Sequence, residues 1–273
     1  MACLRKSAAA LALIVPVVLA GCDSYYFHSG RFLESTRRYP AALRAYENFL
    51  RRFPEDRRAA QVCVSAGDIY ARHFQRCLEA RRHYEAAARL LPQTQPWASR
   101  AQAGIMSCPD YFPLQPGRRW RYGDSESRGR YMRLDRELKV SSGAAAEVLS
   151  VRFAGAKLVN SYKTRYEKRD WGVWEYDGAQ AVAILRYPFK TGHGWKARRG
   201  KVELAYSIDR DDAQVRTVAG TFSNCLKVRE FNKKFPQSWK YDYYAPFVGK
   251  VKTTVAGPDF ENPNTELIEY TAR

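Results

Sequence analysis

Three glycines at a fixed interval constrain the fold of this chain more than any other feature. Gly30, Gly67 and Gly104 stand 37 residues apart, and Tyr46 and Tyr84 follow at a spacing of 38. A period of this size indicates stacked pairs of helices, in which every pair buries its apolar side against the next. The first part of the chain is therefore predicted to be a short helical array.

The positions of small residues and prolines within this array resemble the tetratricopeptide repeat. Gly30 with Ala42, and Gly67 with Ala80, are the small residues expected where two helices of a pair approach closely. The resemblance implies two and a half repeats over residues 25–108, with Gly104 in the first helix of the third unit. The period exceeds the usual value of about 34, and plain helical hairpins are the alternative.

The pattern changes to a period of two after Trp120. Leu134 and Leu138 alternate with charged residues, and the same alternation returns over 149–153 and 202–208. Alternation of this kind predicts strands with one buried face. We expect about nine strands, mostly antiparallel, over residues 118–273, so the fold class is α+β: tetratricopeptide-like hairpins followed by an antiparallel β domain.

Three sequence segments of the second region resemble a β domain found in uncharacterised bacterial periplasmic proteins and lipoproteins. They are residues 108–114, 219–228 and 243–249. The resemblance implies a fold but no activity.

The chain begins with the three parts of an export signal. Arg5 and Lys6 precede an apolar run over 8–20, which is shorter than the roughly 20 residues needed to span a bilayer. The run ends in the residues Leu19, Ala20, Gly21 and Cys22. This exit resembles the bacterial lipobox, which implies cleavage before Cys22 and acylation of its thiol. We therefore divide the chain into a signal peptide over 1–21, a helical repeat domain over 22–108 and a β domain over 109–273.

Export and acylation predict a body anchored to a membrane of the bacterial envelope and facing the periplasm. Asp23 does not decide between the inner and the outer membrane, and the sequence leaves that choice open. The chain carries a net charge of +18. An exported protein is not expected to meet nucleic acid. We expect it to contact the membrane through Cys22 and to bind an acidic protein partner at the helical repeats, with an anionic lipid or glycan as the alternative partner. The other interpretation of the charge is an arginine-rich surface that keeps the body soluble.

Four cysteines remain after the signal peptide and Cys22 are set aside. In the repeat arrangement, Cys77 opens one helix and Cys108 closes the antiparallel neighbour, so these two are predicted to form a disulfide in the oxidising envelope. Cys63 and Cys225 are either buried thiols or a second pair between the two regions.

No motif for catalysis, a cofactor or a metal is present, and we predict a non-catalytic binding or scaffold protein. The first alternative is a carrier of lipid or another apolar ligand, bound on an aromatic concave face of the β domain. That face comprises Trp171, Trp174, Trp239, Tyr241 and Tyr243. An envelope hydrolase using His193 has the least support.

Overall fold

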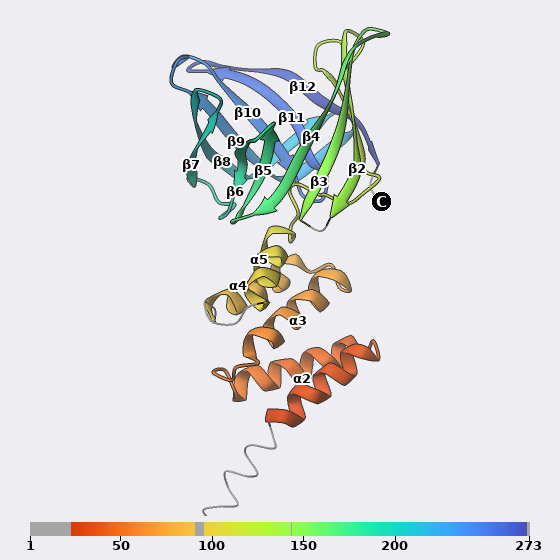
Figure 1. Cartoon of the computed structure of the whole chain (residues 1–273), viewed down its shortest axis with the longest axis vertical. Coiled ribbons are helices and arrows are strands. Elements are labelled where there is room, and N and C mark those ends of the chain that lie inside the picture. The colour runs from red at the N-terminus through yellow and green to blue at the C-terminus, as the bar shows by residue number, and fades with distance from the viewer. Residues whose placement is uncertain (1–22, 91–95, 143, 272–273) are drawn as a thin grey trace, which may run out of the picture. The chain divides into compact units, whose positions relative to one another are not determined.

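The computed structural model describes residues 23–90, 96–142 and 144–271. The chain divides into two units, Met1–Cys108 and Pro109–Arg273, and each is described by itself (Figure 1). Cys22 and the cleavage residues Leu19, Ala20 and Gly21 lie outside the described residues.

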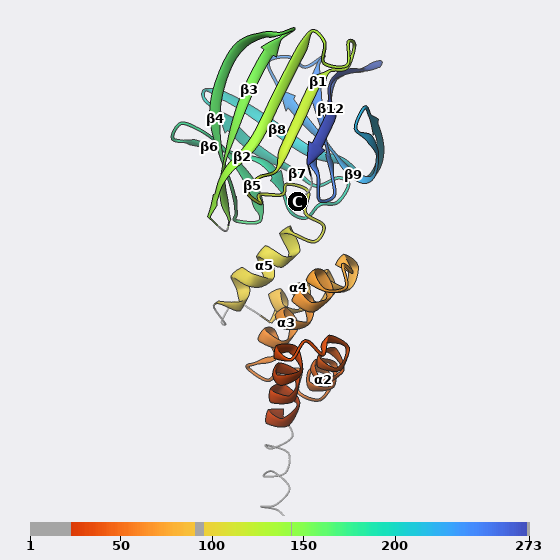
Figure 2. The same cartoon turned by 90° about the vertical axis from the view of Figure 1, so that its right-hand side faces the viewer.

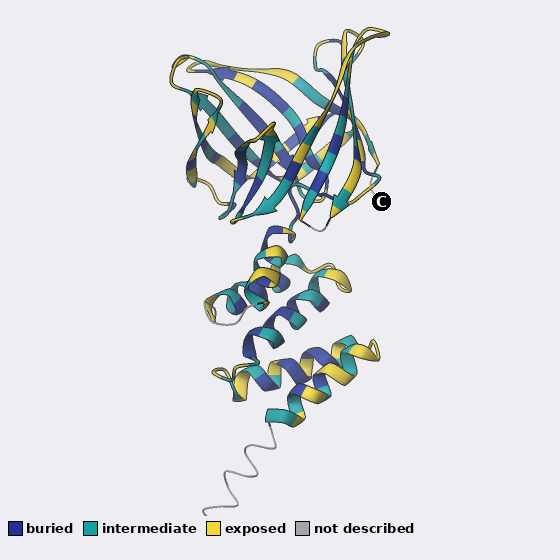
Figure 3. Cartoon of the chain, viewed as in Figure 1, coloured by how far each residue is buried: buried dark blue, intermediate teal, exposed yellow. Residues whose placement is uncertain are grey.

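The first unit is helical. Its described part contains five helices: one over 23–35, α2 (Tyr39–Arg52), α3 (Ala59–Arg72), α4 (Cys77–Arg89) and α5 (Trp97–Met106). Pro40 lies in the first turn of α2, where its missing N–H costs nothing, and Arg51 and Arg52 lie in the last turn, where cations suit the helix dipole. α3 is the most buried helix of the unit (Figure 3). None of the helices among the described residues has both the length and the apolar character needed to cross a membrane.

The glycine period corresponds to a repeated contact between glycine and tyrosine. Tyr46 on α2 packs against Gly30, and Tyr84 on α4 packs against both Gly67 on α3 and Gly104 on α5. A Cβ atom would lie 2.7 Å from the Tyr84 ring at Gly67 and 2.5 Å from it at Gly104. The ring is therefore held between two helices, and a side chain at either glycine would displace it.

Polar contacts and a disulfide hold the same three helices. The Tyr84 hydroxyl donates to Asp68 Oδ1 at 2.8 Å, and Asp68 also pairs with Arg100 at 2.6 Å. Cys77 at the start of α4 is bonded to Cys108 just after α5, with a sequence separation of 31. Cys63 and Cys225 are free thiols, and burial raises the pKa of each to about 11, so both are expected to be unreactive.

The second unit is one antiparallel sheet of twelve strands among the described residues. The strands are β1 (Arg119–Asp124), β2 (Met132–Ser142), β3 (Ala145–Ala154), β4 (Lys157–Arg169), β5 (Gly172–Asp177), β6 (Gln180–Arg186), β7 (Gly194–Arg199), β8 (Val202–Thr217), β9 (Gly220–Asn232), β10 (Trp239–Ala245), β11 (Gly249–Gly257) and β12 (Phe260–Thr271).

The sheet is a meander in which the first and last strands also pair. Its order is β6-β5-β4-β3-β2-β1-β12-β11-β10-β9-β8-β7, and Trp120 of β1 lies opposite Tyr270 of β12. The strands curve around a common interior (Figures 1 and 2). The edge strands β6 and β7 are joined by a hydrogen bond from Trp195 Nε1 to the Ala183 carbonyl at 2.8 Å. The result is a nearly closed, barrel-like sheet.

The sheet has twelve strands among the described residues, whereas the sequence predicts about nine. Strand β4 explains part of the difference. Its first seven residues, 157–163, are exposed, so neither face carries the apolar alternation that marks a strand in sequence. Backbone pairing with β3, such as Ser161 opposite Val151, makes this segment a strand.

We predict that Gly104→Ala destabilises the helical unit by about 1–3 kcal/mol. The added methyl group would press against the Tyr84 ring, which has no room to move because its other side packs against Gly67. Glycine to alanine within a helix is otherwise stabilising by about 0.5–1 kcal/mol, so the sign is diagnostic. Urea unfolding measures the change.

The matched control is the same substitution in a Tyr84→Leu background. Removing the ring should abolish the penalty of Gly104→Ala. An equal penalty in both backgrounds would show that the Tyr84 contact is not its cause.

Candidate functional site

The interior of the sheet is charged. A cavity of about 140 Å³ lies inside the second unit, and strands from both halves of the meander contribute to its walls. Its ionisable lining consists of the cations Arg136, Arg199, Lys240 and Lys250 and the acids Glu175, Glu230 and Asp242. Tyrosine side chains of β4, β8 and β10 complete the polar wall.

Each acid of the interior has a cation beside it. Glu175 accepts from Arg199 at 2.9 Å, and Glu230 lies 3.1 Å from Lys240. Asp242 lies 3.0 Å from Lys240 and 3.5 Å from Lys250, and its Oδ1 also accepts from the Thr253 hydroxyl at 2.6 Å. The Asp242 side chain is only 11% exposed, whereas about a third of each lysine remains accessible to water in the cavity.

These contacts shift the pKa values of the interior groups. Burial alone would raise the pKa of Asp242, but Lys250 and Lys240 outweigh it and hold that pKa well below its usual range. Burial lowers the pKa of Lys250; Asp242 opposes the decrease, and the neighbouring cations Lys240 and Arg136 add to it. Lys250 is therefore the interior cation that burial and its neighbours destabilise.

Of the four cations that line the cavity, Arg136 is the one that forms no ion pair within the described residues. Its Nη2 donates to the Tyr166 hydroxyl at 2.6 Å, and that hydroxyl donates to Glu175 Oε2 at 2.9 Å. Arg136 and Lys250 also line a second, smaller space of about 20 Å³ with mainly apolar walls, among them Phe112 and Leu138. These two cations lie at the junction of a polar and an apolar compartment.

The segment that precedes β1 closes one end of the interior. Phe112 packs against Tyr166 and Tyr244, with ring centroids 4.9 and 6.4 Å away. Trp120 Nε1 donates to the Val248 carbonyl at 2.8 Å. Two of the segments singled out in the sequence, 108–114 and 243–249, thus contribute residues to one end of the sheet.

The expected aromatic concave face is not formed. Trp239, Tyr241 and Tyr243 alternate along β10 with Lys240, Asp242 and Tyr244, which line the cavity, so the three aromatic candidates lie on the outer face. Arg229 lies over the Trp239 ring at 3.9 Å and Lys227 over the Tyr241 ring at 4.0 Å, which covers this outer face.

The tryptophans around β5 lie outside the cavity in the same way. Trp174 alternates with Glu175, which does line the cavity, and its Nε1 donates to the Arg169 carbonyl at 3.0 Å. Trp171 packs against Tyr187, with ring centroids 5.3 Å apart. With charged walls around the larger space and about 20 Å³ in the apolar one, the geometry does not favour a lipid chain.

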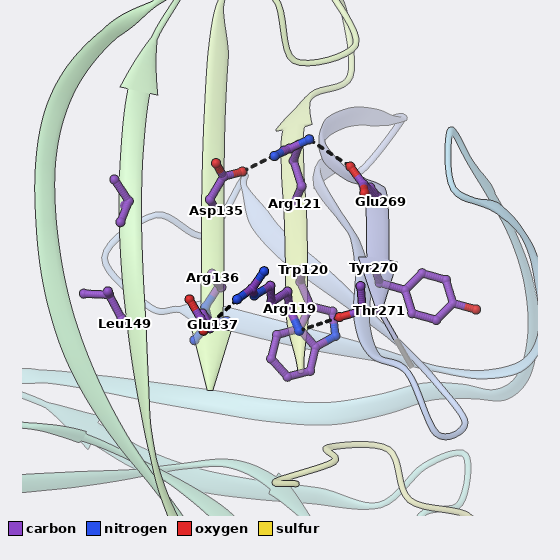
Figure 4. Close-up of a pocket in the computed structure, with 11 residues that line it drawn as sticks. Arg119, Trp120, Arg121, Asp135, Arg136, Glu137, Leu149, Glu269, Tyr270 and Thr271 are labelled. Atoms are coloured by element: carbon purple, nitrogen blue, oxygen red, sulfur yellow. Dashed lines mark hydrogen bonds and ion pairs between the residues drawn. The ribbon is translucent and has the colours of Figure 1, made fainter. Parts of the chain in front are cut away.

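The outer face of β1, β2, β3 and β12 bears an open groove of about 420 Å³ (Figure 4). Arg121 lies there between Asp135 and Glu269, at 2.9 and 2.8 Å, and Arg119 pairs with Glu137 (Figure 4). The arginines are about half exposed or more, and such pairs contribute about 0–1 kcal/mol each. The groove has balanced, solvated charges and is a poor candidate for a site.

The remaining candidates from the sequence are placed as follows. Ala42 and Ala80 are fully buried in the helical unit. His193 stacks on Trp195 at 5.9 Å, and no described nucleophile or carboxylate hydrogen-bonds to its imidazole. No group of three or more metal-ligating side chains assembles within the described residues.

The charged interior is not predicted from the sequence, although the positions of some charged residues along the strands indicate it. Arg136 has the register of Leu134 and Leu138, and Lys240 and Asp242 share one face of β10. A charged residue at apolar register indicates either a strand end or a polar interior.

Comparison with known proteins gives a resemblance of fold only. No family model matches the chain, and no curated protein matches it. The chain is similar to a candidate exported protein with a YmcC-like fold from Bacteroides fragilis: 17% identity, TM-score 0.41, covering 59% of this chain and 98% of that chain. It is also similar to a candidate lipoprotein from Parabacteroides distasonis, with 16% identity, TM-score 0.40 and coverage of 59% and 98%. A hypothetical protein from Chlamydia trachomatis has 13% identity, TM-score 0.26 and coverage of 57% and 87%.

We predict that Asp242→Asn lowers the free energy of unfolding of the sheet by about 2–4 kcal/mol at pH 7, because it leaves Lys250 without a carboxylate partner and Lys240 with Glu230 alone. The folded pKa of Asp242 is lowered, so its stabilisation is present above an unfolded pKa of about 4 and is lost as the pH falls below that value. The difference between wild type and variant should therefore shrink below pH 4.

Urea unfolding followed by tryptophan fluorescence measures this difference at each pH. Asp135→Asn is the matched control, because Asp135 pairs with Arg121 on the outer face and should cost about 1 kcal/mol or less. Equal costs at the two positions would contradict the assignment of a desolvated interior.

Proposed function

We propose that this protein is a non-catalytic lipoprotein of the bacterial envelope, anchored through acylated Cys22, whose helical unit binds an acidic protein partner. The carrying observation is the repeated packing of a tyrosine ring on glycine, combined with a surplus of exposed arginines on the same helices. The packing supports the tetratricopeptide-like reading, because Tyr46 on Gly30 and Tyr84 on Gly67 repeat one contact along the array.

The position of the first helix bears on where this unit acts. Asp23 is the first described residue; it lies in the first helix and pairs with Arg58 at 2.5 Å, so it belongs to the folded helical unit. An acyl group on Cys22 would then hold the helices directly at the headgroups with no linker between them. Two or more acyl chains give firm anchoring at about 0.8 kcal/mol per buried CH₂.

The surface charge of the helical unit favours an acidic partner. Residues 23–108 include fourteen arginines against eight acidic residues and no lysine. Arg44, Arg51, Arg52 and Arg57 are exposed, and none of them forms an ion pair with a described residue. Guanidinium groups that form no intramolecular ion pair are available for carboxylates, which they bind in a bidentate manner.

We expect Cys22→Ser to move the protein from the membrane fraction to the soluble periplasmic fraction, because the variant cannot be acylated. Cys3→Ser is the control: Cys3 lies within the predicted signal peptide, and its loss should leave the protein in the membrane fraction. Fractionation followed by immunoblotting reads both variants. A Cys22→Ser protein that stays with the membrane would contradict the anchor.

We expect a charge-reversed variant with glutamate at Arg44, Arg51, Arg52 and Arg57 to lose its protein partner in cross-linked membranes. A matched variant reverses four exposed cations of the second unit, Lys157, Arg198, Lys201 and Arg216, and makes the same change in net charge. The protein captured with wild type should persist with this control and disappear with the first variant.

Two results would overturn the scaffold proposal. One is capture of the same proteins by both variants, which would mean that the helices do not select them. The other is loss of binding to phosphatidylglycerol vesicles in the first variant with no change in captured protein. That result would assign the arginines to the lipid surface.

A further inference from the structure

We propose that the interior of the sheet is a binding site for a small monoanionic carboxylate with a short apolar end, held by Arg136 and Lys250. This site is independent of the partner proposed for the helical unit. It rests on the charge balance of the cavity, on the hydrogen bonds of its cations and on the two compartments that meet there.

The charge balance leaves one cation over. Four cationic and three acidic side chains line the cavity, and every acid lies within 3.1 Å of a cation. Among the described residues, Arg136 has the Tyr166 and Tyr122 hydroxyls as hydrogen-bond partners and forms no ion pair with a carboxylate. An uncompensated charge inside a protein is costly, and one bound monoanion restores neutrality.

The two cations with the weakest internal pairing are adjacent to the same space. Arg136 donates through Nη2 to the Tyr166 hydroxyl and also interacts with the Tyr122 hydroxyl, so its side-chain hydrogen bonds go to hydroxyl groups and not to a carboxylate. Lys250 has Asp242 at 3.5 Å as its nearest acid, while Lys240 holds that acid at 3.0 Å. A planar guanidinium suits a carboxylate, and an ammonium group beside it supplies a further charged donor.

The neighbouring compartment favours a carboxylate that carries an apolar group. Arg136 and Lys250 line both the cavity of about 140 Å³ and the apolar space of about 20 Å³. Phe112 borders both spaces, and Leu138 and Val148 add apolar wall to the smaller one. The larger space has room for several waters or a ligand of a few non-hydrogen atoms. A short aliphatic acid would place its oxygens at the cations and its terminal carbons against these side chains.

Titration calorimetry of the purified full-length protein with potassium butyrate tests the proposal. Potassium chloride at equal ionic strength serves as the reference. We expect saturable binding of butyrate with a dissociation constant of about 1 mM or tighter. We expect Arg136→Gln to weaken binding by about tenfold or more, as for loss of a charge-assisted hydrogen bond.

Matched variants separate the site from general electrostatics. Arg121→Gln makes the same change on the outer face of β1 and should bind butyrate like wild type. Lys250→Met should weaken binding, whereas Lys252→Met, opposite Tyr243 on the outer face, should not. The lysine pair also keeps the test decisive if Arg136→Gln fails to fold, since Lys250→Met leaves the Arg136–Tyr166 contact in place.

Three results would overturn the proposal. The first is no saturable heat at butyrate concentrations about ten times the expected dissociation constant. The second is an equal effect of the inner and outer variants of either pair. The third is inorganic phosphate or chloride binding as tightly as butyrate, which would show that the interior cations attract any anion and do not select a carboxylate.

Discussion

The ion pairs around Asp242 are the interaction on which the interior of the sheet depends. Asp242 on β10 contacts Lys240 of its own strand and both Lys250 and Thr253 of β11. Without this carboxylate, Lys250 would have no acid beside it and Lys240 would have only Glu230. The pairing is possible because the lysines keep about a third of their surface in contact with the cavity, which limits the cost of desolvation.

Closure of the sheet determines what those charges enclose. Pairing of β1 with β12 joins the ends of the meander, and Phe112 packs against Tyr166 and Tyr244 at one end. An apolar plug beside a charged wall divides the interior into two compartments of different polarity. Arg136 and Lys250 lie where the compartments meet, so their surroundings follow from closure and not from their immediate sequence neighbours.

Local periodicity predicted much of the fold and little of the site. The glycine period located the helical unit because each interval reproduces one contact of a tyrosine ring with glycine. Alternation located β2, β3 and β8, but it missed the exposed first half of β4. It also cannot say which face of a strand turns inward. In β10 the aromatic Trp239, Tyr241 and Tyr243 suggested a concave ligand-binding face, yet the long-range pairing of the meander turns Lys240, Asp242 and Tyr244 inward.

The outer aromatics explain how such an inversion is tolerated. Arg229 and Lys227 on β9 lie over the rings of Trp239 and Tyr241, so cationic side chains cover apolar surface that would otherwise need a core. A strand can then place aromatic residues outside, with a cation over the ring, and charges inside.

Arginine and lysine thus have two roles in the sheet. On the outer face their stems and charges cover aromatic rings, and in the interior they neutralise acids, with Arg136 left over. The strongly basic composition is therefore only partly a property of the surface. The cations in the interior act on a ligand at short range and are little screened by salt, so they can be selective.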